Sequence, residues 1–110
     1  MIKDTDIEKV LQVYPGLSAE GLNKAGRPLD KNHVAVAVKW LKKQERRISV
    51  NPTCSSYGLK HVVERAPGGV YITNGAFIAA AVLLGFTIQH LGSSPNVRIN
   101  ISNSYRKKIK

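Results

Sequence analysis

Apolar positions recur every three or four residues in several stretches of this chain, a spacing that is typical of amphipathic helices. The first predicted helix covers residues 5–14, where Thr5 and Glu8 match the capping box that begins many helices. Pro15 and Gly16 end it. The following segment, up to residue 29, has turn-forming residues and is expected to connect this helix to the next.

The longest predicted helix begins at Asp30, a favourable N-terminal cap, and continues to about Arg47. One face is apolar, and the opposite face carries four basic side chains. These are Lys39, Lys42, Lys43 and Arg46. Such a face is either a solvated surface or a second binding face for a polyanion, and the sequence favours neither. A short strand is expected over residues 48–50, before a turn at residues 51–52.

A third helix is predicted over residues 57–65, with Ser55 or Ser56 as its cap. Its inner face is apolar. Its outer face places an aromatic ring among polar and charged groups, at Tyr57, Lys60, His61, Glu64 and Arg65. That combination suits contact with phosphates and stacking on bases, so we expect the Lys60 side chain to be exposed.

A fourth helix is expected from Thr73 or Asn74 to Leu84, with Gly85 at its C-terminal stop. The free N–H groups at its start would favour a phosphate. One face consists of small or apolar residues, at Gly75, Ala76, Ala79, Ala80 and Leu83. These side chains cannot read bases by hydrogen bonds, which favours packing within the chain or across a homodimer over contact with thymine methyl groups.

After residue 85 the period changes from helical to alternating. Strands are expected over residues 86–91 and 97–102, joined by a loop at 92–96. The prediction is therefore an α+β fold with an N-terminal helical extension (1–29), a central domain (30–102) that ends in a β-hairpin, and a mobile basic tail (103–110).

Charge narrows the choice of partners. The net charge is +10, and residues 31–110 hold thirteen basic side chains against two acidic ones. A concentrated positive field attracts polyanions, of which nucleic acid is the commonest in cytoplasm. An acidic protein or a merely soluble basic protein remains an alternative. The single cysteine excludes an internal disulfide and favours a cytoplasmic location.

Catalytic and metal chemistry find little support in this sequence. Cys54 and His61 could form a nucleophile pair, but no third residue is in place to orient the imidazole. The histidines and the cysteine lack zinc-site spacing. The apolar run 76–86 is too short for a membrane span of about 20 residues. We expect no enzyme, no cofactor, no metal, no membrane partner and no small-molecule substrate.

The element order over residues 30–102 is helix, short strand, helix, turn, helix, strand, loop and strand, and it resembles the winged helix-turn-helix superfamily. The resemblance implies DNA binding, with the helix from Thr73 in the major groove and the loop 92–96 against the backbone. Two features depart from the pattern. The connection 66–72 is long, and the presumed reading helix is poor in polar side chains.

We therefore expect a DNA-binding protein that contacts mainly phosphates, such as a small transcription regulator or accessory factor. Duplex DNA is favoured and RNA is the variant. The expected contacts are Tyr57, Lys60, His61, Arg65, Thr73, Asn74, Asn96, Arg98, Arg106, Lys107 and Lys108. The alternative is an interaction protein or inhibitor that docks on another macromolecule or ribonucleoprotein.

Overall fold

The computed structural model describes residues 2–108, which form four α-helices, a two-stranded antiparallel hairpin and a final 3-10 helix. The helices are α1 (Asp4–Val13), α2 (Lys31–Leu41), α3 (Ser56–Arg65) and α4 (Asn74–Leu83). The strands are β1 (Ile88–His90) and β2 (Val97–Ile99), and the 3-10 helix is η1 (Asn103–Lys108). The fold is thus α+β with a hairpin after the helices, as expected.

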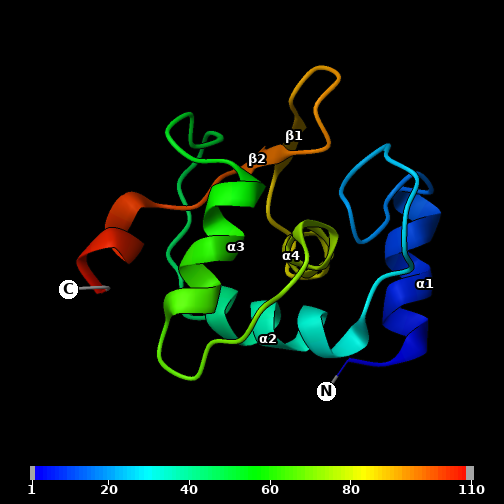
Figure 1. Ribbon diagram of the computed structural model, residues 1–110. Coiled ribbons are helices and arrows are strands. Elements are labelled where there is room, and N and C mark those ends of the chain that lie inside the picture. The colour runs from blue at the N-terminus through cyan, green and yellow to red at the C-terminus, as the bar shows by residue number, and fades with distance from the viewer. Residues whose placement is uncertain (1, 109–110) are drawn as a thin grey trace.

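The central element is α4. Figure 1 looks along its axis, with α1, α2 and α3 around it and the hairpin above. All of its residues from 74 to 81 are buried, because a helix that is apolar on every side after Asn74 gains by packing on every side. Thr73 caps it by accepting a hydrogen bond from the Ala76 N–H at 3.2 Å. Gly85 follows with a left-handed φ of 79°.

The small-residue face of α4 is mostly buried inside the domain, and at Gly75 it contacts the chain's own N-terminal segment. The Gly75 N–H donates to the Ala19 carbonyl at 2.9 Å, and a Cβ at Gly75 would lie only 1.7 Å from the Ser18 carbonyl oxygen. Ala79 and Ala80 are fully buried, and Leu83 is half-buried. Most of this face is therefore buried within the folded domain, whereas the winged-helix resemblance implied that this helix lies in the major groove of DNA.

The segment after α2 differs from the prediction. The helix ends at Leu41, not near Arg47, and no strand forms at residues 48–50, where Ile48 is 102% exposed. The cause is pairing with a distant segment. The Arg47 N–H donates to the Asn100 carbonyl at 2.8 Å, and the Ser102 N–H donates to the Glu45 carbonyl at 2.8 Å. These backbone hydrogen bonds outweigh the helical preference of residues 42–47.

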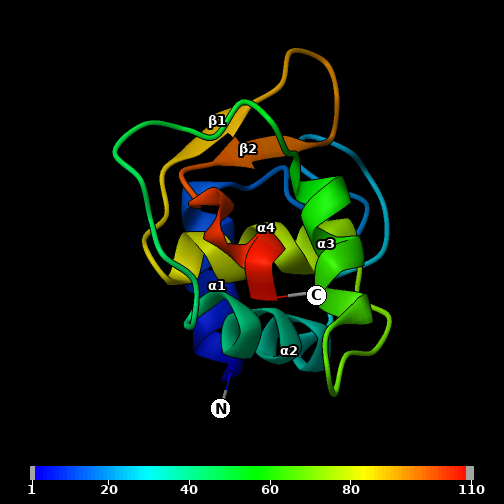
Figure 2. The same cartoon turned by 90° about the vertical axis from the view of Figure 1, so that its left-hand side faces the viewer.

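The hairpin is shorter than predicted but has the expected alternation. β1 and β2 pair antiparallel with Ile88 opposite Ile99, and Val97, Ile99 and Ile101 are all buried. The alternating face closes the core over α4, as Figure 2 shows from the side. One-sided burial of this kind is what a period of two residues requires.

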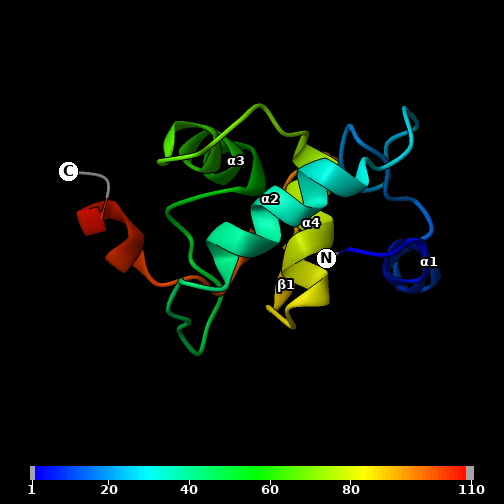
Figure 3. The same cartoon turned by 90° about the horizontal axis from the view of Figure 1, so that it is seen from below.

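Both ends of the chain need correction. The first helix begins at Asp4, and Asp6 accepts from the Lys3 N–H at 2.9 Å, so the Thr5–Glu8 box is not formed. Residues 103–108 are a 3-10 helix, not a loose tail, because Tyr105 is buried against Trp40. Figure 3 shows η1 and α1 on opposite sides of the molecule. Residues 109–110 and the side chains of Lys107 and Lys108 lie outside the described part.

Candidate functional site

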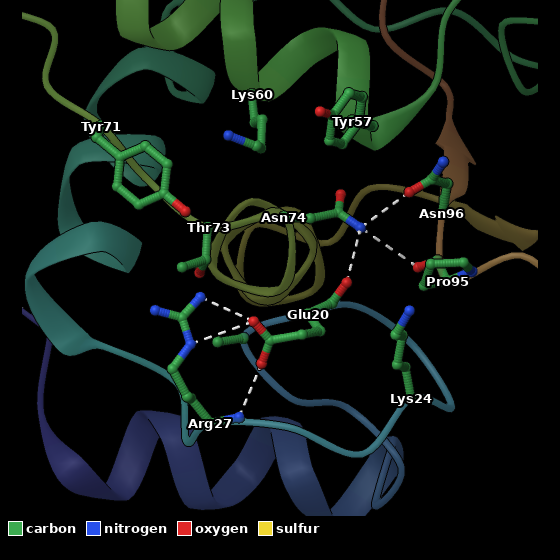
Figure 4. A pocket seen from close by; sticks show the side chains of 11 residues that line it. Glu20, Lys24, Arg27, Tyr57, Lys60, Tyr71, Thr73, Asn74, Pro95 and Asn96 are labelled. Atoms are coloured by element: carbon green, nitrogen blue, oxygen red, sulfur yellow. Dashed lines mark hydrogen bonds and ion pairs between the residues drawn. The ribbon is translucent and has the colours of Figure 1, made fainter.

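A cleft of about 400 Å³ lies where α3, the start of α4, the hairpin loop and the N-terminal connector meet (Figure 4). Its walls come from four segments that are far apart in sequence. The lining residues are Ala19, Glu20, Lys24, Arg27, Tyr57, Lys60, Tyr71, Thr73, Asn74, Pro95 and Asn96. Most of these side chains are polar or charged, and two are aromatic, so the cleft suits a polar ligand with a flat ring.

Five residues that the sequence singled out meet in this cleft. They are Tyr57, Lys60, Thr73, Asn74 and Asn96. The other candidates lie elsewhere. His61 and Arg65 are further along α3, and Arg98 is half-buried on β2. Arg106 is exposed on η1, where it donates to the Thr53 hydroxyl at 3.2 Å.

The prediction that Lys60 is exposed was wrong. Only 5% of the residue is exposed, and its ammonium donates to Glu64 Oε2 at 2.7 Å and to the Ile72 carbonyl at 2.9 Å. The helical pattern placed it on the outer face, but the long connection 66–72 folds back over that face. Lys60 therefore acts as a structural link at the edge of the cleft more than as a mobile cation.

Glu64 is the partner that makes this burial tolerable. Burial would raise the pKa of its carboxyl, but hydrogen bonds from Lys60, from the Ile72 N–H and from His61 together hold that pKa below its usual value. The carboxylate is therefore ionised at neutral pH. A buried cation with such a partner is stable, whereas either charge alone would not be.

Two tyrosine rings stand on either side of Lys60 (Figure 4). Tyr57 is 52% exposed and Tyr71 is 60% exposed. The Lys60 Nζ lies 4.7 Å from the Tyr71 ring centroid and 5.7 Å from that of Tyr57. His61 meets the Tyr57 ring in a T-shaped contact at 4.7 Å. The rings are thus held in place while more than half of each residue remains open to solvent.

Asn74 occupies the floor of the cleft with a fixed orientation. Its amide nitrogen donates to Asn96 Oδ1 at 2.9 Å and also faces the carbonyls of Glu20 and Pro95 at 3.4 and 3.5 Å. Its oxygen Oδ1 is buried and lacks a hydrogen-bond partner among the described residues. Figure 4 shows that this oxygen points up between Lys60 and Tyr57.

The start of α4 does not offer the free N–H groups that the sequence suggested for a phosphate. The Gly75 N–H is bonded to Ala19, and the Ala76 N–H is bonded to Thr73 Oγ1. The donors that a phosphate would need at this helix start are therefore largely used within the chain.

Among the charged and aromatic lining residues, sequence reasoning missed four, namely Glu20, Lys24, Arg27 and Tyr71. Arg27 donates twice to Glu20 Oε1, at 2.8 and 3.2 Å, and this contact lowers the pKa of Glu20. Three of the four lie in the connector assigned to a separate extension, whose net charge gave no hint of a basic site. A usable signal for Tyr71 was its place beside the cap of α4.

The second basic face is only partly assembled on the surface of α2. Lys39, Lys42 and Lys43 are exposed on and just after α2. Arg46, by contrast, lies outside the helix. Its guanidinium donates to the Leu84 carbonyl and sits 4.2 Å above the Phe86 ring. Arg46 thus satisfies the C-terminal end of α4, where a positive charge is favourable.

Metal binding, nucleophilic chemistry and membrane insertion find no assembled site in the described part of the chain. Within residues 2–108, no three His, Cys, Asp or Glu side chains gather where a metal ion could bind. Burial raises the pKa of the Cys54 thiol, which leaves it a poor nucleophile at neutral pH. None of the described helices has the length and apolar character to cross a membrane.

Comparison of the chain with protein-family models, with curated proteins and with solved structures finds no match.

Proposed function

We propose that this protein is a non-enzymatic nucleic-acid-binding protein whose contact surface is centred on the cleft. The proposal rests on one observation, which is that residues from separate segments of the chain meet in one cavity. Tyr57, Asn74 and Asn96 come from three separate segments, were selected from the sequence for nucleic-acid contact, and line one cavity with Lys24 and Arg27. Aromatic rings among cations and amides form a surface that suits bases and phosphates together.

The charge balance supports a polyanionic partner. Several of the seven acidic side chains are occupied within the chain: Asp4 with Lys31, Glu20 with Arg27, Glu64 with Lys60, and Asp30 at the start of α2. The remaining basic excess faces solvent, and Lys24 is one of its exposed members beside the cleft. Such a field favours association with phosphates.

The burial of α4 decides which mode of binding we favour. A helix enclosed by the rest of the domain cannot enter the major groove, so we propose contacts from its surroundings, including the hairpin loop at Pro95 and Asn96. The loop would then approach the backbone as the wing does in winged-helix proteins. Binding of this kind depends mainly on phosphates and suits an accessory factor or regulator.

The alternative function is that of an interaction protein or inhibitor that docks on another macromolecule, for which the polar-poor face of α4 is the candidate surface. Most of that face is buried within the domain, and at Gly75 it is in contact with the N-terminal segment, so it offers little docking surface. Nucleic acid therefore remains the better-supported partner.

The test is a fluorescence-anisotropy titration of duplex DNA, single-stranded DNA and RNA at several salt concentrations. If about six phosphates are contacted, log K should fall with log salt at a slope of roughly −5. Lys24→Ala should flatten the slope by about one unit, whereas Lys9→Ala, an exposed lysine of α1, should not. Absence of binding to all three nucleic acids at low salt would contradict the proposal.

A further inference from the structure

We infer that the cleft receives the base of one unpaired nucleotide of a single strand. This assignment rests on the proposed function and deepens it, because it names which part of the nucleic acid enters the cavity. Three features carry it: an unpartnered buried acceptor, an adjacent donor, and two open aromatic rings.

The acceptor is Asn74 Oδ1. Asn74 is only 6% exposed, yet this oxygen has no partner among residues 2–108, and a buried polar atom without a partner is costly. Rotating the amide would not help, because the nitrogen already faces the carbonyls of Glu20 and Pro95, which can only accept. The oxygen is therefore held toward the cavity, where a donor from a ligand would satisfy it (Figure 4).

The donor is the amide nitrogen of Asn96. Its oxygen accepts from Asn74 Nδ2 at 2.9 Å, which turns its own nitrogen away from Asn74 (Figure 4). The cleft thus carries an acceptor and a donor on two amides that are hydrogen-bonded to each other. The hydrogen-bonding edge of every nucleobase also carries a donor next to an acceptor.

The aromatic rings supply the stacking surface. Tyr57 and Tyr71 border the same cavity and are each more than half exposed. Stacking on an aromatic side chain suits any base, because every base has a π-face. A cavity of about 400 Å³ is large enough for one base with its sugar, and Lys24 at the rim is placed for the adjoining phosphate.

The base must be unpaired. In a duplex its hydrogen-bonding edge is occupied and its faces are stacked, so neither Asn74 nor the tyrosines could engage it without extrusion. In a single strand the hydrogen-bonding edge and the faces of the base are accessible without the cost of extrusion. The cleft should therefore prefer single strands over duplexes of equal charge.

The experiment compares a labelled single strand with a strand of the same length made of abasic deoxyribose phosphates. The intact strand should bind about tenfold more tightly, because stacking contributes only when a base is present. Tyr57→Leu should bring the two affinities close together without changing the salt slope. Val70→Ala is the matched control, because Val70 is 53% exposed beside Tyr71 but does not line the cleft. Thermal melting verifies that each variant is folded.

The outcomes separate this inference from the proposed function. Equal binding of the intact and abasic strands would overturn the base site while leaving phosphate binding in place. No binding of any strand or duplex would overturn both. If free adenosine monophosphate bound as tightly as the strand, the ligand would be a free nucleotide, and the assignment to a strand would fail.

Discussion

The ammonium group of Lys60 lies 2.7 Å from Glu64 Oε2, one helical turn further along α3. The two side chains of this pair also bind the two backbone polar groups of Ile72. Lys60 donates to the Ile72 carbonyl, and Glu64 accepts from the Ile72 N–H at 3.2 Å. Ile72 itself is fully buried just before α4. The pair therefore fixes the chain at the point where the cleft and the core meet.

Replacing Lys60 should destabilise the protein. Lys60→Ala would leave the half-buried Glu64 carboxylate without its Lys60 partner, and removal of one member of such a pair costs about 3 kcal/mol. The free energy of unfolding in urea should fall by that amount. Lys9→Ala, which removes an exposed lysine of α1, should change it by less than about 0.5 kcal/mol. Equal effects of the two substitutions would show that the Lys60 pair contributes nothing to folding.

Acid should weaken the fold partly through Glu64. Burial opposes ionisation of this carboxyl, but its hydrogen bonds lower its pKa in the folded state, while in the unfolded chain a glutamate titrates near about 4.3. The stabilisation is thus complete above that pH and is lost as pH falls through the lower, folded-state pKa. Glu64→Gln should be less stable than the parent at neutral pH. The urea midpoints of the parent and of Glu64→Gln should approach each other as the pH is lowered to about 3. A constant gap between the two proteins at every pH would contradict this assignment.

Two helical glycines should respond in opposite ways to alanine. A Cβ at Gly75 would lie 1.7 Å from the Ser18 backbone oxygen, so Gly75→Ala should cost at least about 2 kcal/mol. At Gly58 on α3 a Cβ would meet only Ser55 Oγ, at 3.9 Å, and Gly58→Ala should stabilise by about 0.5–1 kcal/mol. Thermal melting of both variants checks the packing of the N-terminal segment on α4. A higher melting temperature for Gly75→Ala would refute that packing.

Helices α1, α2 and α3 could be predicted from periodicity because each one buries a regular apolar face, whereas α4 could be predicted from its N-terminal cap and from Gly85 at its end. The segment after Leu41 could not, because its conformation depends on backbone pairing with residues 100–102, more than 50 positions away. Asn51 illustrates the same limit. Its amide nitrogen donates to the Ile101 carbonyl at 2.9 Å, and the buried side chain is fixed by a segment that no local pattern brings near it.

The cleft was predictable only in part, for a similar reason. Tyr57 and Asn74 could be selected because one lies on an exposed helical face and the other at a helix start. Arg27 could not, since its connector reads as a separate extension until the contact of Ala19 with Gly75 places it beside α4. Lys60 lines the cleft, but the prediction that it is exposed was wrong, because helical projection takes no account of the loop that covers it.

The most direct test of the central claim is a nitrogen–proton correlation NMR titration with a short single-stranded oligonucleotide. We predict that the largest shifts fall on the backbone amides of Lys24 and Asn96 and on the side-chain amide of Asn74, which all border the cleft. The exposed basic residues Lys39 and Lys42, which do not line the cleft, should shift little. Shifts concentrated around Lys39 and Lys42, with the signals of Lys24, Asn74 and Asn96 unmoved, would contradict the account.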